Sequence, residues 1–155
     1  MITYTKRKFR ILLALMIVNL IFIWGNSLLT GDVSAQISKW IREILSIVFE
    51  GGNDLTGKGH GVLRKLAHFV EFCSLGLLLT WLFALGKKAV AHPFICGFLV
   101  ACTDEIIQCF VPDRGPSVAD VALDTLGVCI GVALFYLLLT IYKKQNKVSM
   151  EDKKQ

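Results

Sequence analysis

The sequence places its strongest charges inside or directly beside long apolar runs, where a soluble protein would not place them. The run at 64–85 begins with four ionisable residues and then continues for fourteen residues without a charge. Two further apolar runs, at 94–111 and 118–142, carry acidic residues in the same way. An ionisable group at membrane depth costs roughly 2.5 to 3.5 kcal/mol on insertion scales, so such groups mark functional positions by default.

Composition agrees with a membrane location for these runs. Hydrophobic residues make up 54% of the 155 positions, and the mean hydropathy is +0.60. We therefore predict an all-α membrane protein with about four transmembrane helices, at 11–29, 66–85, 89–111 and 118–142, because each run approaches or exceeds the roughly 20 residues that cross a bilayer. A signal peptide at the first run is the weaker alternative, since that run is longer than the ~7 to 15 apolar residues of a signal sequence.

The segment between the first two runs predicts one extracytoplasmic amphipathic helix, at about 33–49. Its apolar residues recur at helical spacing, with polar residues on the opposite side. Asp32 is the predicted N-cap, and the helix is expected at the outer membrane interface or as a lid over the spans. Residues 50–61 contain five glycines and predict a loop. We predict a single transmembrane domain at 1–145, followed by a cytoplasmic basic tail at 146–155.

Basic residues predict the orientation of the chain. With both termini in the cytoplasm, eleven of the seventeen lysines and arginines lie on the cytoplasmic side and six lie outside. This bias favours a multi-pass membrane protein with cytoplasmic N- and C-termini. The net charge of +5 is thereby explained as a topology signal, and nucleic-acid binding is not needed to account for it.

Helical geometry brings the polar residues of the last three predicted spans together at their outer ends. At about 100° per residue, Arg64, His68 and Glu71 share one narrow face. Corresponding polar faces occur on the other two spans, so we expect one outward-facing pocket, roofed by the amphipathic helix. The predicted ligand-binding residues are Arg64, Lys65, His68, Glu71, Asp104, Glu105, Gln108, Arg114, Asp120 and Asp124.

Glycines indicate which face of the last span is buried. Asp120 and Asp124 line up with Gly127 and Gly131, and glycines four residues apart allow another helix to approach closely. The face that carries the two aspartates is therefore predicted to point into the helix bundle and away from lipid.

Charges in the predicted pocket do not balance. Three basic residues, Arg64, Lys65 and Arg114, face six acidic ones, Glu71, Asp104, Glu105, Asp113, Asp120 and Asp124. Either some carboxyl groups are protonated or a divalent cation completes the site. The alternative is purely structural, with basic side chains reaching the lipid head groups and one or two ion pairs holding helices together.

Specific chemistry is indicated only in part. His68, Glu71 and Asp124 are candidate catalytic groups, although an interhelical hydrogen bond would explain His68 equally well. Asp120 and Asp124, at i and i+4, are candidate oxygen ligands for Mg²⁺. A zinc-protease motif is absent because the HxxE sequence of His68 and Glu71 lacks its second histidine.

Two stretches, RKLAHFVEFCSLGLLL and DEIIQCFVPDRGPSVADVALDTLGVCIG, resemble the VanZ family of small bacterial membrane proteins, whose founding member is associated with teicoplanin resistance. The resemblance extends from the end of the first span through the fourth. It is looser at residues 24–27, where a Ser-Gln element is expected, and at Asp113, where glycine is more usual. It implies a role in the cell envelope and is compatible with lowered susceptibility to glycopeptides.

The leading functional hypothesis is non-enzymatic binding. The pocket would take an outer-leaflet lipid, a cell-wall precursor, or a lipopeptide or glycopeptide, with Arg64, Lys65 and Arg114 meeting phosphate or carboxylate groups. A membrane-embedded enzyme that acts on polyprenyl or phospholipid head groups is the alternative. A proton-coupled transporter ranks third, since the titratable groups gather on one side of the membrane only.

Overall fold

A computed structural model describes residues 5–48, 59–86, 90–112 and 114–152. This part of the chain forms five helices and contains no strand, so the predicted all-α class is confirmed for it. The helices are α1 (Lys6–Ser27), α2 (Gly31–Val48), α3 (Gly59–Leu85), α4 (Ala91–Gln108) and α5 (Val118–Asp152).

Three helical segments in the described residues are long and apolar enough to cross a membrane: Lys6–Ser27, Leu63–Leu85 and Val118–Asn146. The predicted count of about four is not confirmed, because α4 does not belong to this group. Its 18 residues span about 27 Å, slightly less than a hydrocarbon core of about 30 Å. Asp104 and Glu105 also lower its mean hydropathy.

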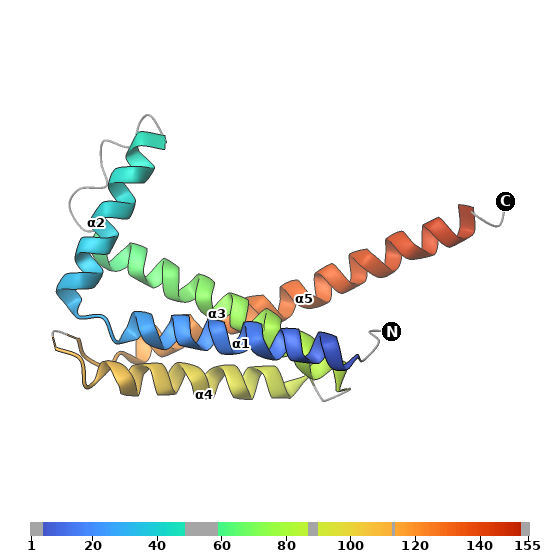
Figure 1. Ribbon diagram of the computed structural model, residues 1–155, viewed down its shortest axis with the longest axis horizontal. Coiled ribbons are helices and arrows are strands. Elements are labelled where there is room, and N and C mark those ends of the chain that lie inside the picture. Colours follow the sequence, from blue (N-terminus) through green and yellow to red (C-terminus); the bar gives the residue numbers. More distant parts are fainter. Residues whose placement is uncertain (1–4, 49–58, 87–89, 113, 153–155) are drawn as a thin grey trace.

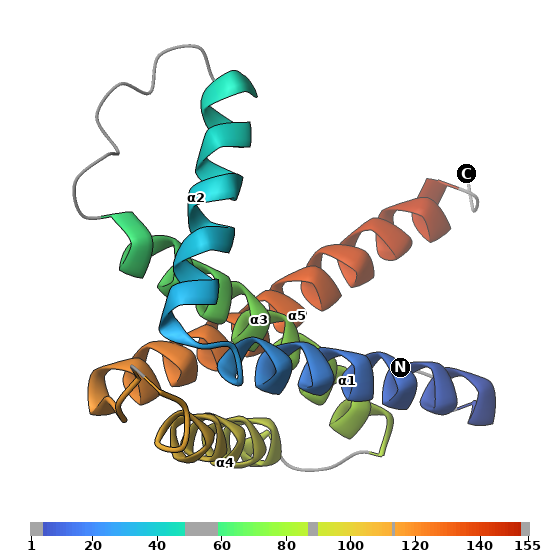
Figure 2. The ribbon, with the colours of Figure 1, turned by 60° about the vertical axis from the view of Figure 1, so that its left-hand side comes forward.

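A bundle of α1, α3, α4 and the first half of α5 forms the body of the molecule (Figure 1), and the C-terminal half of α5 projects beyond it (Figure 2). Helix α3 packs against α1, α2, α4 and α5. The helix of the last predicted span does not end near 142 but continues to Asp152, so the expected tail at 146–155 is helical as far as the structure describes it.

The predicted amphipathic helix is present as α2, although its start and its placement differ from the prediction. It begins at Gly31, which puts Asp32 in the first turn and not at the N-cap. Helix α2 leans away from the bundle (Figures 1 and 2) and packs against α3, so it flanks the bundle and is not a lid over it. Of the loop expected at 50–61, the last three residues belong to α3, and the others lie outside the described residues.

Close packing of α3 against α5 rests on glycines of both helices. A Cβ atom on Gly127 would lie 2.8 Å from the carbonyl oxygen of Phe69, and one on Gly131 would lie 2.8 Å from the backbone nitrogen of Leu77. On α3, a Cβ atom on Gly76 would meet the backbone of Val128. The two backbones are therefore in direct contact, and the predicted burial of the glycine face of α5 is confirmed.

Apolar side chains fill the centre of the bundle and also cover its outside. The buried cluster consists of Ile23, Phe72, Leu75, Leu79, Ala101, Val128 and Val132. On α1, by contrast, only 11% of the most apolar window is buried, and Phe22 is 68% exposed. A contiguous apolar surface of this kind is what a lipid environment accommodates and water does not.

Candidate functional site

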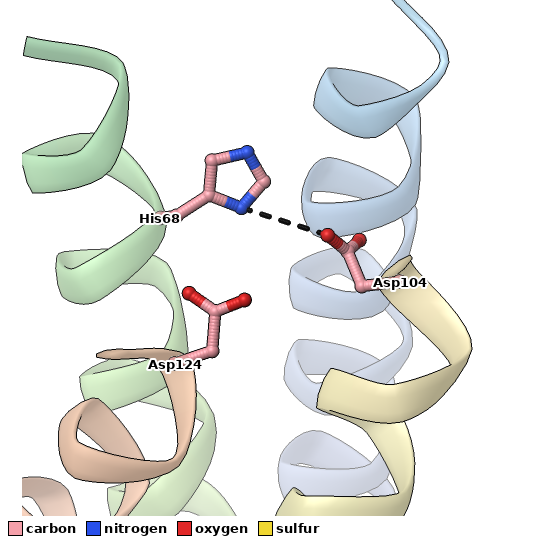
Figure 3. Close-up of side chains that lie close together, drawn as sticks. All are labelled: His68, Asp104 and Asp124. Carbon is pink, nitrogen blue, oxygen red and sulfur yellow. Dashed lines mark ion pairs between the residues drawn. The ribbon is translucent and has the colours of Figure 1, made fainter. Parts of the chain in front are cut away.

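Three buried polar side chains meet inside one end of the bundle, each from a different helix. Figure 3 shows His68 of α3 and Asp124 of α5 on one side and Asp104 of α4 opposite them. Their relative exposures are 6% for His68, 0% for Asp104 and 2% for Asp124. One ligand atom from each residue lies within 4.8 Å of the other two, and His68 Nδ1 is 3.8 Å from Asp104 Oδ2. We call these three residues the buried triad.

The carboxylate of Asp104 is held in place by two hydrogen bonds. Ser27 Oγ, at the end of α1, donates to Oδ1 at 2.6 Å. Gln108 Nε2, one turn further along α4, donates to Oδ2 at 2.9 Å. Spacing of i and i+4 places Gln108 on the same helical face as Asp104. Both carboxylate oxygens therefore have fixed donors, and the group has little freedom to rotate.

Asp124 is brought to His68 by backbone contact between α3 and α5. Gly127 lies one turn after Asp124 and touches Phe69, the neighbour of His68. Because glycine lets the two backbones approach closely at this point, short acidic and imidazole side chains one turn away can meet. The geometry of the triad is thus set by the glycines of α5.

A second layer of polar contacts surrounds the triad at the same end of the bundle. Lys65 forms an ion pair with Asp120. Glu105 Oε2 accepts a hydrogen bond of 2.7 Å from the backbone N–H of Ser117, which precedes α5. Buried Glu105 Oε1 has no hydrogen-bond partner among the described residues. The ion pair therefore links α3 to α5, and the hydrogen bond of Glu105 holds the connection between α4 and α5.

Arg114, in the connection between α4 and α5, reaches back to the end of α1. Its Nη1 donates a hydrogen bond of 3.3 Å to the carbonyl oxygen of Ser27. Burial lowers the pKa of its guanidinium, and the positive charge of nearby Arg64 lowers this pKa further. The Nε and Nη2 atoms are buried without hydrogen-bond partners among the described residues, so two further nitrogens of the guanidinium can donate hydrogen bonds.

A groove opens beside the triad, between α1, α2 and α3. Its volume is about 490 Å³, and apolar side chains make up most of its wall. Arg64 and Glu71 of α3 supply its charged groups. The lining residues are Ile21, Phe22, Gly25, Asn26, Leu29, Ser34, Ile37, Ile41, Leu63, Arg64, Ala67 and Glu71.

Arg64 connects this groove with the triad. It also lines a much smaller space, of about 10 Å³, that borders His68 and Asp124. Among the residues that the structure describes, Arg64 has no ion-pair or hydrogen-bond partner. Its guanidinium is thus available to a ligand in either space.

Comparison with known proteins identifies the family. The family model described as VanZ/LLP1 matches residues 9–139. The chain belongs to the VanZ/LLP1 family. The predicted VanZ resemblance is thereby confirmed, and with three membrane-length helices the chain is a VanZ-like membrane protein. No curated protein and no solved structure matches the chain.

In this VanZ/LLP1 chain, most of the sequence-predicted site residues gather at one end of the bundle, as expected. They divide, however, into two neighbouring spaces. Glu71 lines the groove and accepts a hydrogen bond of 2.9 Å from Asn26 Nδ2, whereas Asp104 and Asp124 face His68. Asp113 lies outside the described residues.

In the candidate site, the side chains that contact one another differ from those that helical spacing suggested. Asp120 and Asp124, named as candidate ligands of one Mg²⁺, point to different neighbours, since Asp120 pairs with Lys65. Similarly, the carboxylates nearest His68 come from α4 and α5, whereas Glu71 of its own helix faces α1. Spacing along one helix identifies a shared face but not the helix that packs against it.

Polar residues of α1 contact α3 and α4 in and near the candidate site and were not among the predicted site residues. Asn26 binds Glu71, Ser27 binds Asp104, and Asn19 Nδ2 donates to Ser74 Oγ at 2.6 Å. The signal available in the sequence was the spacing of Asn19 and Asn26, which are seven residues apart in an otherwise apolar run and therefore share one helical face.

Proposed function

We propose that this VanZ/LLP1 chain binds a membrane lipid or lipid-linked cell-wall precursor with an anionic head group in the groove between α1, α2 and α3. The observation that carries the proposal is an apolar groove whose wall contains Arg64, an arginine without an ion-pair or hydrogen-bond partner among the described residues. Acyl or prenyl chains would lie along Ile21, Phe22 and Ile37, and a phosphate or carboxylate would bind Arg64. Guanidinium groups bind such anions through two parallel hydrogen bonds.

The volume and position of the groove support a lipid as the occupant. At about 490 Å³, it falls within the roughly 300 to 1,000 Å³ of small-molecule sites. It lies between two helices of membrane length and the amphipathic α2, where a lipid can enter sideways. With both termini in the cytoplasm, as the basic residues predict, the groove would face the outer leaflet of a bacterial plasma membrane.

Lipid analysis of the purified full-length protein tests this proposal. Native mass spectrometry of the wild type should detect a co-purified anionic lipid, and Arg64→Ala should lose it. Arg10→Ala is the matched control, because Arg10 is an exposed arginine of α1 and does not line the groove. Equal lipid content in the wild type and Arg64→Ala would contradict the proposed site.

A steric variant tests the apolar part of the groove. A Cβ atom on Gly25 meets nothing within 4 Å, so Gly25→Leu should fit without disturbing the helices and should fill the groove. We expect it to displace the lipid, whereas Ala14→Leu, at an exposed position of the same helix, should retain it. Lipid retained in Gly25→Leu would place the acyl chains elsewhere.

An enzymatic function is the second candidate, and the environment of His68 favours it. Neither ring nitrogen of this buried histidine has a hydrogen-bond partner among the described residues, and Arg64 borders the same small space. A histidine placed beside an anion-binding arginine can transfer protons to or from a phosphorylated head group. Release of phosphate or head group by purified wild type, but not by His68→Ala, would establish this function in place of simple binding.

Lowered susceptibility to teicoplanin-type glycopeptides is the cellular effect we propose to measure. If a groove-bound envelope lipid underlies it, expression of the wild type in a susceptible bacterium should raise the inhibitory concentration of teicoplanin. Arg64→Ala expressed at the same level should not. Equal protection by both proteins would show that lowered teicoplanin susceptibility does not depend on the groove.

A further inference from the structure

The buried triad has the composition of a metal site. It combines one imidazole and two carboxylates, from α3, α4 and α5, with ligand atoms within 4.8 Å of one another. We propose that His68, Asp104 and Asp124 bind one divalent transition-metal ion, of the Zn²⁺ or Mn²⁺ class. This site differs from the pair of candidate ligands on α5, Asp120 and Asp124, because Asp120 forms an ion pair with Lys65.

The state of His68 is the independent observation that points to a missing ligand. The side chain is only 7% exposed, and both Nδ1 and Nε2 lack a hydrogen-bond partner among the described residues. Buried polar groups are normally satisfied. The ring is directed toward the two carboxylates (Figure 3), so a metal ion between them would take up one nitrogen.

Charge balance supports a divalent ion. Asp104 and Asp124 are almost fully buried, and with a neutral histidine the ionised triad carries two negative charges. Among the described residues, arginine and lysine do not pair with these two carboxylates, since Lys65 pairs with Asp120. His68 Nδ1, at 3.8 Å from Asp104 Oδ2, forms an ion pair only when the imidazole is protonated. One divalent cation would neutralise the two carboxylates. Each carboxylate would then be attracted to the ion, which outweighs the repulsion between the carboxylates.

Distances within the triad permit coordination after small side-chain movements. An ion at the centre of a triangle with 4.8 Å sides lies about 2.8 Å from each corner, whereas Zn²⁺ takes nitrogen and oxygen ligands at roughly 2.0 to 2.2 Å. Movements of less than about 1 Å therefore complete the site. Mixed nitrogen and oxygen ligands favour Zn²⁺ or Mn²⁺, because Mg²⁺ and Ca²⁺ prefer oxygen alone.

The surroundings of the triad resemble those that orient metal ligands. Ser27 and Gln108 each donate a hydrogen bond to Asp104, and such outer contacts fix the direction of a coordinating carboxylate. Three protein ligands also leave a coordination position open. The adjoining space of about 10 Å³ has room for about one water or one ligand oxygen there.

Metal titration of the full-length protein, purified in detergent without a histidine tag, tests the site. Chelator-treated wild type should bind Zn²⁺ with a stoichiometry near one ion per chain. His68→Ala and Asp124→Asn should abolish this binding or weaken it at least tenfold. Loss of the outer contact in Ser27→Ala should weaken it roughly 10- to 100-fold.

Matched controls show whether the effect is local. His92→Ala removes an exposed histidine of α4, and Asp32→Asn removes an exposed carboxylate of α2; both should bind Zn²⁺ as the wild type does. Spin-echo modulation of Mn²⁺ bound to the wild type should detect an imidazole nitrogen, and this measurement does not depend on any variant folding. Two results would overturn the site. One is unchanged Zn²⁺ binding by a folded His68→Ala. The other is a wild type that binds no Zn²⁺ and shows no nitrogen coupling to Mn²⁺.

Because metal is the only probe, this experiment is independent of lipid binding. Failure of metal binding would leave the lipid-binding groove in place, and loss of lipid from Arg64→Ala would leave the metal site in place. If the triad instead shares protons or holds a water, no divalent ion should bind the wild type at micromolar concentration.

Discussion

Replacement of Gly127 by alanine is the most direct test of how the site is assembled. The added methyl group would lie 2.8 Å from the carbonyl oxygen of Phe69 and 3.2 Å from Cβ of Phe72. Ordinary van der Waals contact begins at 3.4 Å, so α3 and α5 must separate locally by roughly 0.6 Å. Such overpacking costs about 1 to 3 kcal/mol, and the higher helix propensity of alanine returns at most about 1 kcal/mol.

We therefore expect Gly127→Ala to lose about 1 to 2 kcal/mol of unfolding free energy. Gly25→Ala is the matched control, because the same methyl group meets nothing within 4 Å there and should stabilise the helix by about 0.4 to 1 kcal/mol. At about 2 to 4 °C per kcal/mol for a chain of this size, the two variants should differ clearly in melting temperature. Thermal unfolding in detergent, monitored by size-exclusion chromatography of the protein that remains folded, measures this difference in melting temperature.

The result that refutes this reasoning is a Gly127→Ala protein as stable as Gly25→Ala, since α3 and α5 would then not be in backbone contact. Gly127→Leu extends the test to function. By forcing the helices apart, it should move Asp124 away from His68 and lower Zn²⁺ affinity as Asp124→Asn does. Leu137→Ala, at a position 55% exposed on α5, should leave affinity unchanged.

Three further outcomes can be checked separately. Lys65→Ala should change the unfolding free energy by at most about 1 kcal/mol, since the lysine side chain of this ion pair is 47% exposed; a loss above about 2 kcal/mol in chemical denaturation would contradict a peripheral role. Ser27→Ala should destabilise the protein by about 1.5 to 3 kcal/mol in the same assay, because it removes a hydrogen bond to a buried carboxylate, and an unchanged stability would argue against that bond. In a cysteine-free background, Gly115→Cys should react with an impermeant maleimide on intact cells and Lys144→Cys only after permeabilisation; the reverse pattern would invert the proposed topology.

The polar partners of α3 show where prediction from sequence ends. His68 and Glu71 were placed on one face of a helix, and both do point into the protein. Helical spacing says nothing about the neighbouring helix, however, and a difference of three residues turns the side chain by about 60°. That turn is enough for Glu71 to meet Asn26 of α1 while His68 meets Asp104 and Asp124.

The sequence by itself determined the helices, the buried glycine face of α5 and the family. The membrane helices follow because a backbone in lipid must satisfy its hydrogen bonds within each segment, so apolar length predicts them. Helix α2 follows from the helical spacing of its apolar residues. The tertiary structure decided the pairing of charges, the position of α2 beside the bundle, and the groove. These depend on which helix faces cross and how closely. Periodicity predicted one pocket for residues 68, 104 and 124, but it did not predict that these three residues would face one another while Glu71 lines a separate groove.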